Sequence, residues 1–380
     1  MTTESNFPSA VLSIDESVLT PIVRQALQRD RVQILDWRVS QLGGGAGNPV
    51  SAGLYRFAGS AQDRDQRVAW SVILKTIQSP ANVGWENMGE GDDQTHWNYW
   101  RRELLVYRSD LLTALPVGLT APRCYGTAEL PGDVAWLWLE DVADDNEDAW
   151  SLERYALAAR HLGRLNGVYL AGRPLPDVPW LSMQRTRQWF AMGPLWETIP
   201  WDHPLVRQRY PRPAANTFRR LLFENERFLA RLDLLPRTLC HGDTYPTNFK
   251  LRRLDDGQEQ TVALDWALVG IESVGDDLGQ FIYGTQMSLK DTAPDAVDAT
   301  LFEGYLDGLL DSGYHPDRQM LRFAVTTSAA IRVGLFQLIM LDGALKQNGT
   351  DVASGSGQPA AADCFEVVKA KEAYQLLEAI

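Results

Sequence analysis

The chain reads Cys-His-Gly-Asp-Thr-Tyr-Pro-Thr-Asn-Phe at residues 240–249, and Val-Ala-Leu-Asp-Trp follows at residues 262–266. These stretches supply a carboxylate at Asp243, an amide at Asn248, and a second carboxylate at Asp265 after a short apolar run. Phosphoryl transfer needs an oriented hydroxyl, a base near its proton, and cations on the phosphate oxygens. The pattern His-x-Asp-x-x-x-x-Asn followed by Asp offers the base and the metal ligands for that chemistry.

Each polar side chain of this motif has a predicted role. Asp243 is the candidate catalytic base, because it is a short acid that a loop presents. Asn248 and Asp265 are the candidate metal ligands, since Mg²⁺ prefers hard oxygen ligands. His241, which we group with Asp243 in the catalytic loop, is expected to brace that loop through hydrogen bonds. The alternative is that Asp243 and Asn248 only cap one turn while Asp265 begins another.

The first part of the chain is rich in strand patterns. Apolar or alternating β-rich runs occur at residues 31–42, 54–57, 68–77, 122–127 and 134–142. The first two runs are joined by a glycine-rich segment, in which backbone N–H groups at Gly44 and Gly45 could lie over phosphates without side-chain obstruction. No Gly-Lys-Ser/Thr follows it, so it is not a P-loop. A flexible turn is the alternative interpretation.

A lysine and a glutamate further along suggest an ion pair. Lys75 lies near the end of the apolar run at residues 68–77, where a kinase-like fold holds a phosphate-binding lysine. Residues 95–115 have apolar positions at helical spacing and contain Glu103. We expect Glu103 to pair with Lys75 and keep it charged. A lysine exposed past the strand edge and an exposed helix glutamate are the alternatives.

The composition changes after residue 141. Residues 143–148 form an acidic connector, so we place a boundary between an N-terminal nucleotide-binding lobe, residues 1–141, and a C-terminal catalytic and substrate-binding lobe, residues 142–380. The backbone at Glu140 and Val142 is expected to form a hinge that hydrogen-bonds an adenine edge. Beyond it the sequence is mostly helical by period. Helices are expected at residues 10–29, 151–170, 215–235, 293–310, 317–341 and 363–380.

Composition restricts the class of protein. The 380 residues are 45% hydrophobic and 22% charged, with a net charge of −13, so we expect a two-lobed globular protein that does not bind nucleic acid. No apolar run of about 18 residues occurs, so no membrane span is expected. Three cysteines at irregular spacing and a first segment without a signal-peptide pattern favour a cytoplasmic location. Residues 171–213 are rich in Pro and Trp, and their role stays open.

At these residues the chain resembles the aminoglycoside phosphotransferase/choline kinase superfamily. The motifs that carry the resemblance are His-Gly-Asp-Thr-Tyr-Pro-Thr-Asn at 241–248, Leu-Asp-Trp at 264–266, GIESVGDDLGQFI at 270–282, WRRELLVY at 100–107 and VILK at 72–75. The resemblance implies a bilobal, protein-kinase-like α+β fold, with an antiparallel sheet and one key helix in the first lobe and a larger, mostly helical second lobe. It also implies that Asp243 is the base, that Asn248 and Asp265 hold metal, and that Lys75, supported by Glu103, binds nucleotide phosphates.

The function predicted on these grounds is an ATP- or GTP-dependent, Mg²⁺-dependent phosphotransferase that acts on a hydroxyl of a small molecule. Aminoglycosides or other antibiotics, amino alcohols and sugar-like compounds are candidate acceptors, and net acidity with 13 tryptophans favours a cationic one. An inactive nucleotide-binding scaffold is the alternative. A protein kinase is a third, which the short span from Asp265 to Asp277 disfavours. For the oligomeric state, both a monomer and a homodimer are compatible with the sequence.

Overall fold

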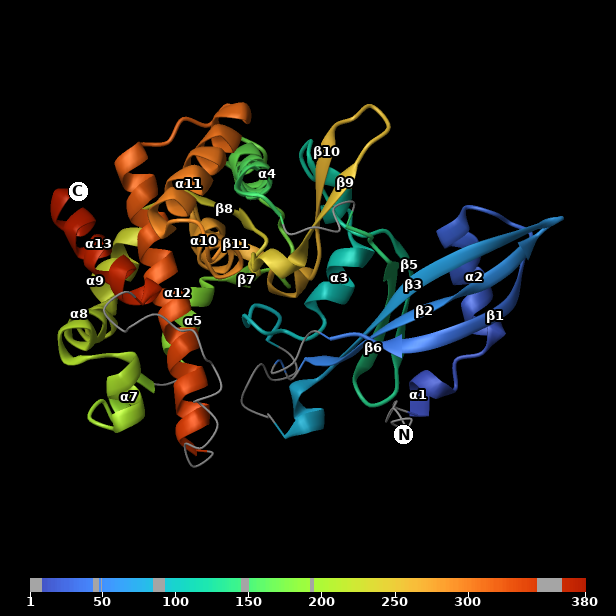
Figure 1. Ribbon diagram of the computed structural model, residues 1–380, viewed down its shortest axis with the longest axis horizontal. Helices are drawn as coiled ribbons and strands as arrows, with labels where there is room; N and C mark the ends of the chain where they lie inside the picture. The colour runs from blue at the N-terminus through green and yellow to red at the C-terminus, as the bar shows by residue number, and fades with distance from the viewer. Residues whose placement is uncertain are drawn as a thin grey trace.

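The computed structural model describes residues 9–43, 48, 50–84, 93–144, 150–191, 195–346 and 364–380. An antiparallel sheet occupies one end of the molecule and a group of helices the other (Figure 1). The sheet is formed by the first part of the chain, in blue and green, and the helices by the rest. The predicted α+β class, with a sheet region followed by a mostly helical region, is confirmed.

The five-stranded sheet has the strand order β1-β2-β3-β6-β5, and all its neighbouring strands are antiparallel. All five predicted strands are present, although three of them, β2, β3 and β5, are longer than their sequence patterns. Their bounds are β1 (Val32–Gln41), β2 (Ser51–Asp63), β3 (Gln66–Gln78), β5 (Cys124–Leu130) and β6 (Val134–Glu140). Strand β3 is central in this sheet, which explains its long apolar run.

The two faces of the sheet carry separate apolar clusters. Val72 and Leu74 of β3 belong to a cluster with the helix α2 (Glu16–Leu27), which follows the short α1 (Ser9–Leu12). Ile73 and Ile77 belong to a cluster that contains Leu104 of α3 (Arg102–Arg108). Side chains of a strand alternate between faces. Lys75 therefore lies on the same face as α3, the helix that carries Glu103.

The rest of the chain packs around one large apolar cluster. Its helices are α4 (Leu152–Leu170), α5 (Arg185–Ala191), α6 (Leu195–Thr198), α7 (Pro204–Arg209), α8 (Arg212–Phe223), α9 (Asn225–Asp233), α10 (Asp276–Ser288), α11 (Pro294–Asp311), α12 (Arg318–Lys346) and α13 (Phe365–Ala379). Among the described residues, early and late in the chain, there are also four short 3₁₀ turns: Pro80–Val83, Leu111–Ala114, Pro246–Asn248 and Trp266–Leu268. Figure 1 shows α4, α10, α11 and α12 gathered away from the large sheet.

Two small sheets support the segment around Asp243. One has the order β4-β10-β9 and the other β7-β11-β8. Their strands are β4 (Leu119–Thr120), β7 (Ser182–Met183), β8 (Arg237–Cys240), β9 (Phe249–Arg253), β10 (Glu259–Ala263) and β11 (Gly270–Ser273). Leu119 of β4 pairs with Thr261 of β10, so a strand from before residue 141 joins a sheet of the later part. The division of the chain at residue 141 stays a prediction.

Helix α12 passes the length and composition test for a membrane span, but 78% of its apolar window is buried inside the protein. Its buried side is continuous with the large apolar cluster, where Phe323, Ile331 and Leu338 have no more than 1% of their surface exposed. The apolar character of this helix is therefore explained by its place in the core.

The helix predicted at residues 95–115 is wrong over most of its length. Only Arg102–Arg108 is α-helical, and residues 94–101 form turns. The Arg102 guanidinium, which is fully buried, donates hydrogen bonds to the backbone carbonyl groups of Gln94, His96 and Trp97. Carbonyl groups gathered around one side chain cannot also point along a helix axis. Apolar spacing alone could not reveal this anchor.

The helix predicted at residues 215–235 is two helices, α8 and α9, which meet at Glu224. The Asn225 side-chain amide donates to the carbonyl of Leu222 at 2.6 Å. An asparagine that takes a backbone carbonyl in this way competes with the helical hydrogen bond. The break lets α9 contact the core through Phe228 and Leu232, which are buried.

His161 is a buried residue of the core. It lies on α4 with 2% of its surface exposed, and its Nδ1 is 2.8 Å from the Thr261 hydroxyl of β10. Burial, together with the nearby Arg164 and Arg160, lowers the pKa of His161 from 6.5 to about 4. His161 is therefore neutral in the folded protein at any pH above that value.

This burial predicts a pH dependence of stability. Below pH 6.5 the His161 imidazole is protonated in the unfolded chain but stays neutral in the folded protein. The free energy of unfolding therefore falls as the pH drops from 6.5 to about 4. We expect this loss to amount to roughly 3 kcal/mol. His161→Gln keeps a neutral hydrogen-bonding side chain, so its stability should fall less over the same interval. Urea unfolding of both proteins at several pH values measures the difference, and parallel curves would contradict the prediction.

Candidate active site

Lys75 joins the sheet to the segment that carries Asp265. Its ammonium Nζ lies 2.6 Å from Glu103 Oε2 and 2.9 Å from Asp265 Oδ1. The Glu103 side chain is 1% exposed, and that of Lys75 is 12% exposed. The predicted Lys75–Glu103 ion pair is confirmed as a contact, and the contact with Asp265 is an addition that the sequence did not suggest.

The charges of this cluster support one another. Burial disfavours an ammonium, but Asp265 and Glu103 outweigh that effect and raise the pKa of Lys75. Burial likewise disfavours the Asp265 carboxylate, but Lys75 outweighs it, so the pKa of Asp265 is lowered. Both groups are therefore ionised at neutral pH. Asp265 is 34% exposed, which leaves part of its carboxylate open to a ligand.

Asp243 and Asn248 lie against each other. The Asn248 side-chain amide donates to Asp243 Oδ2 at 2.9 Å and to the Asp243 backbone carbonyl at 3.0 Å. Because its nitrogen is engaged with two acceptors, its oxygen points elsewhere and is available to a cation. Burial and the charge of Asp265 raise the pKa of Asp243, a direction that makes its carboxylate a better proton acceptor.

His241 braces the loop through both ring nitrogens. Nδ1 accepts a hydrogen bond from the Asp243 backbone N–H at 3.2 Å, and Nε2 donates to the Leu264 carbonyl at 2.9 Å. This arrangement requires the neutral tautomer protonated at Nε2. Burial lowers the pKa of His241 and so favours that neutral form. The expected bracing contacts are confirmed, and they link Asp243 to the residue before Asp265.

Asp277 fixes the backbone that leads into Asp243. Its two carboxylate oxygens accept hydrogen bonds from the backbone N–H groups of His241 and Gly242, each at 2.9 Å. Gly242 has φ +87°, and a Cβ there would lie 2.0 Å from the Leu268 carbonyl oxygen. Only glycine satisfies both the dihedral angle and this close approach. The sequence motif therefore contains Gly242 for a steric reason.

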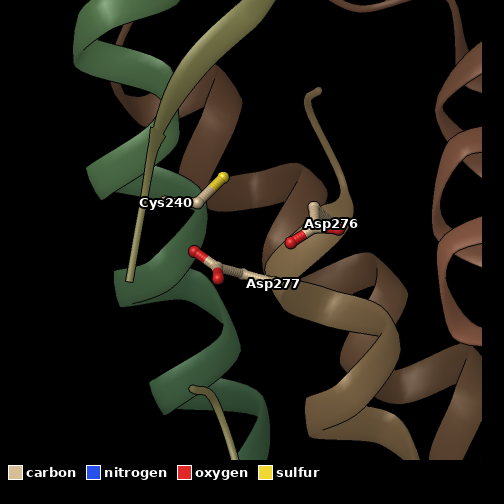
Figure 2. Close-up of side chains that lie close together, drawn as sticks. All are labelled: Cys240, Asp276 and Asp277. Atoms are coloured by element: carbon tan, nitrogen blue, oxygen red, sulfur yellow. The ribbon is translucent and has the colours of Figure 1, made fainter. Parts of the chain in front are cut away.

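A second group of possible metal ligands lies beneath the loop. Cys240 at the end of β8 and Asp276 and Asp277 at the start of α10 point toward one another, with their ligand atoms within 4.8 Å (Figure 2). Asp276 is already paired with Arg185 at 2.5 Å and with Arg332 at 3.2 Å. Burial raises the pKa of the Cys240 thiol, which keeps it protonated. The group therefore serves as support for the loop rather than as a metal site.

Four further residues were predicted to contact the nucleotide: Gly44, Gly45, Glu140 and Val142. Gly44 and Gly45 lie outside the described residues. Glu140 ends strand β6, and its backbone N–H already donates to the Arg123 carbonyl at 2.8 Å. Its carboxylate accepts from Arg123 and from Arg252, at 3.2 and 2.6 Å. Val142 is half-buried two residues beyond the strand, and its adenine contact stays a prediction.

Several residues that hold the site could not be recognised from the sequence motifs. Gln280 of α10 and Arg332 of α12 contact the loop directly, and Arg185 of α5 reaches it through the Leu268 carbonyl at 2.9 Å. Gln280 lies within the motif at residues 270–282, but that motif does not indicate a role for it. Arg185 lies in the Pro- and Trp-rich stretch, which therefore supplies part of the support beneath the site.

The oxygen atoms at this site fit a divalent cation such as Mg²⁺. Asp265 offers a partly exposed carboxylate, and Asn248 offers an amide oxygen whose nitrogen is turned toward Asp243. Both are hard ligands of the kind that Mg²⁺ prefers, and a site of only two protein ligands is usual where phosphate oxygens and water complete the coordination.

No protein-family model and no curated protein matches this sequence. Solved structures do match its architecture. A choline kinase from Cryptosporidium parvum Iowa II has a TM-score of 0.52 at 11% identity, over 96% of each chain. The chain therefore has the fold of this choline kinase. An amicoumacin kinase, hAmiN, in complex with AMP-PNP, Ca²⁺ and Ami, has a TM-score of 0.50 at 12% identity, over 98% of this chain and 96% of its own. The protein-kinase-like fold implied by the sequence motifs is confirmed.

The role of Gly242 in this kinase-like loop can be tested by substitution. Gly242→Ala would combine a positive φ with a collision against the Leu268 carbonyl, so we expect it to lower the free energy of unfolding by about 3 kcal/mol or more. Gly257 in the β9–β10 turn has φ +81° and open space around it, so Gly257→Ala should cost only about 1 to 2 kcal/mol. Chemical unfolding of both variants separates the collision from the strain, and equal losses would contradict the steric argument.

Proposed function

We propose that this protein is a Mg²⁺- and nucleotide-dependent phosphotransferase that phosphorylates a hydroxyl group of a small molecule. One observation supports the proposal most strongly. Lys75 from the large sheet lies 2.9 Å from Asp265, which His241 and Leu264 link to Asp243. A cation for phosphate, a carboxylate for metal and a carboxylate for a proton thus lie within one continuous set of contacts, as phosphoryl transfer requires.

The roles follow from the chemistry of each side chain. Lys75, held charged by Glu103, would bind the phosphates of the nucleotide. Asn248 and Asp265 would hold Mg²⁺, which supplies positive charge to the phosphate oxygens when bound. Asp243 would accept the proton of the acceptor hydroxyl as it attacks, and its raised pKa suits that task. His241 would keep the loop in place without exchanging protons itself.

The acceptor is proposed only as a class, a small molecule with a free hydroxyl. The preference for a cationic acceptor suggested by the tryptophan content loses most of its support. Eight of the 13 tryptophans are buried in apolar clusters or against the loop: Trp70, Trp100, Trp136, Trp138, Trp150, Trp180, Trp196 and Trp266. Core packing accounts for them without a ligand. Amino alcohols, aminoglycosides and sugars therefore enter the acceptor search on equal terms, as do ATP and GTP as donors.

Metal-dependent nucleotide binding is the first test. We expect ATP or GTP to raise the melting temperature more with Mg²⁺ than without it, because a ligand that binds only the folded state stabilises it. Asp265→Ala should weaken Mg-nucleotide binding by at least about tenfold, equivalent to ~1.4 kcal/mol. Asp255→Ala, at an exposed position of the β9–β10 turn, is the matched control. Unchanged binding in Asp265→Ala would refute the metal role, and an absence of any nucleotide effect would refute the kinase proposal.

Turnover is the second test. In an ADP-formation screen over the three acceptor classes, Asp243→Asn should lower kcat by at least about 100-fold, as expected for loss of a general base. Its affinity for Mg-nucleotide should stay close to that of the wild type, since the substitution leaves Lys75 and Asp265 in place. Full activity of Asp243→Asn would overturn the base assignment. Nucleotide binding without turnover of any acceptor would favour the inactive scaffold.

A further inference from the structure

The Asp243 carboxylate accepts an amide hydrogen bond on each of its oxygens. Asn248 donates to Oδ2 at 2.9 Å, and Gln280 Nε2 on helix α10 donates to Oδ1 at 3.1 Å. Asn248 belongs to the same sequence motif as Asp243, but Gln280 lies 37 residues away in the sequence. Two donors on opposite oxygens fix the rotation of a carboxylate more firmly than one. Each oxygen keeps a further lone pair for an incoming hydroxyl.

The orientation of the Gln280 amide is determined by its other contacts. Its Oε1 accepts hydrogen bonds from the Thr244 backbone N–H at 2.8 Å and from Arg332 Nη2 at 2.9 Å. A backbone N–H and a guanidinium can only donate. Reversing the amide would place its NH₂ group against both donors and its oxygen against the Asp243 carboxylate. Gln280 must therefore donate to Asp243.

Arg332 connects this glutamine to the backbone next to Asp243. Its side chain on α12 is 3% exposed, and it pairs with Asp276 at 3.2 Å. Arg332 Nη2 donates to both the Gly242 carbonyl and Gln280 Oε1. One buried guanidinium therefore holds both the peptide group before Asp243 and the amide that contacts its side chain. A buried arginine held by an ion pair and by two further hydrogen bonds is a rigid support.

We propose that Gln280, held in place by Arg332, is a positioning residue that fixes the Asp243 carboxylate for proton transfer. The proposal rests on the proposed role of Asp243 as the base. Base catalysis depends on geometry first, because the carboxylate must lie within hydrogen-bond reach of the acceptor hydroxyl. A carboxylate free to rotate spends part of its time out of reach, and turnover falls although nucleotide binding does not.

A purely structural role for Gln280 makes different predictions. In that case its contact with Thr244 ties α10 to the loop, and its loss lowers stability and disturbs nucleotide binding together with turnover. The positioning role instead predicts a fall in kcat at constant affinity. It also predicts that the effect disappears when Asp243 has already been replaced, since the glutamine then has no base to position.

Gln280→Glu is the most selective test. It retains an oxygen that accepts from Thr244 and Arg332 but replaces the N–H donor that faces Asp243. Gln286→Glu makes the same chemical change on the same helix, at a partly exposed position where the Gln286 amide donates a hydrogen bond to the Pro294 carbonyl at 3.0 Å. The readout is phosphate release from Mg·ATP with water as acceptor, measured on the full chain, together with Mg·ATP affinity.

We expect Gln280→Glu to lower kcat by about 10- to 100-fold, the equivalent of one hydrogen bond to a charged group. The KM for Mg·ATP should change less than about twofold. In the Asp243→Asn background, Gln280→Glu should cause no further loss. Gln286→Glu should match the wild type throughout. An equal fall in turnover with and without Asp243, or unchanged turnover in Gln280→Glu, would overturn the proposal.

A second measurement keeps the inference independent of activity. Gln280→Met removes the N–H donor at similar side-chain length, and we expect its crystal structure to show the Asp243 carboxylate rotated or in several orientations. A single, unchanged orientation would overturn the proposal even if the wild type turned over no nucleotide. Conversely, a wild type that binds but never turns over Mg·ATP or any acceptor refutes the proposed function, whatever the orientation of Asp243 in the variant.

Discussion

The ion pairs of Lys75 with Glu103 and Asp265 are the interaction on which the site depends, because they connect three segments that share no sequence neighbourhood. A buried ion pair is weak evidence for stability, since the desolvation of both charges offsets most of their attraction. Here the ion pairs matter because they determine the relative positions of strand β3, helix α3 and the Asp265 segment. Removing Lys75 would leave the buried Glu103 carboxylate and Asp265 without a cation, at a cost of about 3 to 5 kcal/mol, so the helix and the Asp265 segment satisfy their charges through the lysine of strand β3.

Beneath the loop, a second polar group acts in the same way. Arg185 and Arg332, with 0% and 3% of their surface exposed, share the Asp276 carboxylate. Arg332 donates to the Gly242 carbonyl of the loop, and Arg185 donates to the Leu268 carbonyl of the segment that follows Asp265. Apolar residues of similar volume could fill this space with comparable stability. They could not hold carbonyl and amide groups at defined positions. The polar interior is therefore explained by the orientation it imposes on Asp243 rather than by the stability of the fold.

Local periodicity predicted most elements because each depends on its own side chains. The strand β3 and the helices α4 and α11 lie within one or two residues of their expected bounds. The prediction failed where a distant contact competes with local preference. Arg102 takes the carbonyl groups of the turn before α3, and its own position is fixed by the Trp180 and Ala267 carbonyls from far along the chain. No window of sequence around residues 95–101 contains that information.

The sequence by itself determined which chemical groups the site contains: two acids, an amide and a lysine, in an order typical of one kind of fold. The Lys75–Glu103 pair was expected from the order of the strand and the helix that carry these residues. Tertiary structure alone decided that Lys75 also contacts Asp265, that the acids beside Cys240 support the loop instead of holding metal, and that Gln280 and Arg332 hold Asp243. The physical reason is that these contacts form between elements far apart in the sequence, β3 with the Asp265 segment and α10 and α12 with the loop, whose packing brings together side chains dozens of residues apart. Residue type limits what a side chain can donate or accept, whereas only packing determines which partner it meets.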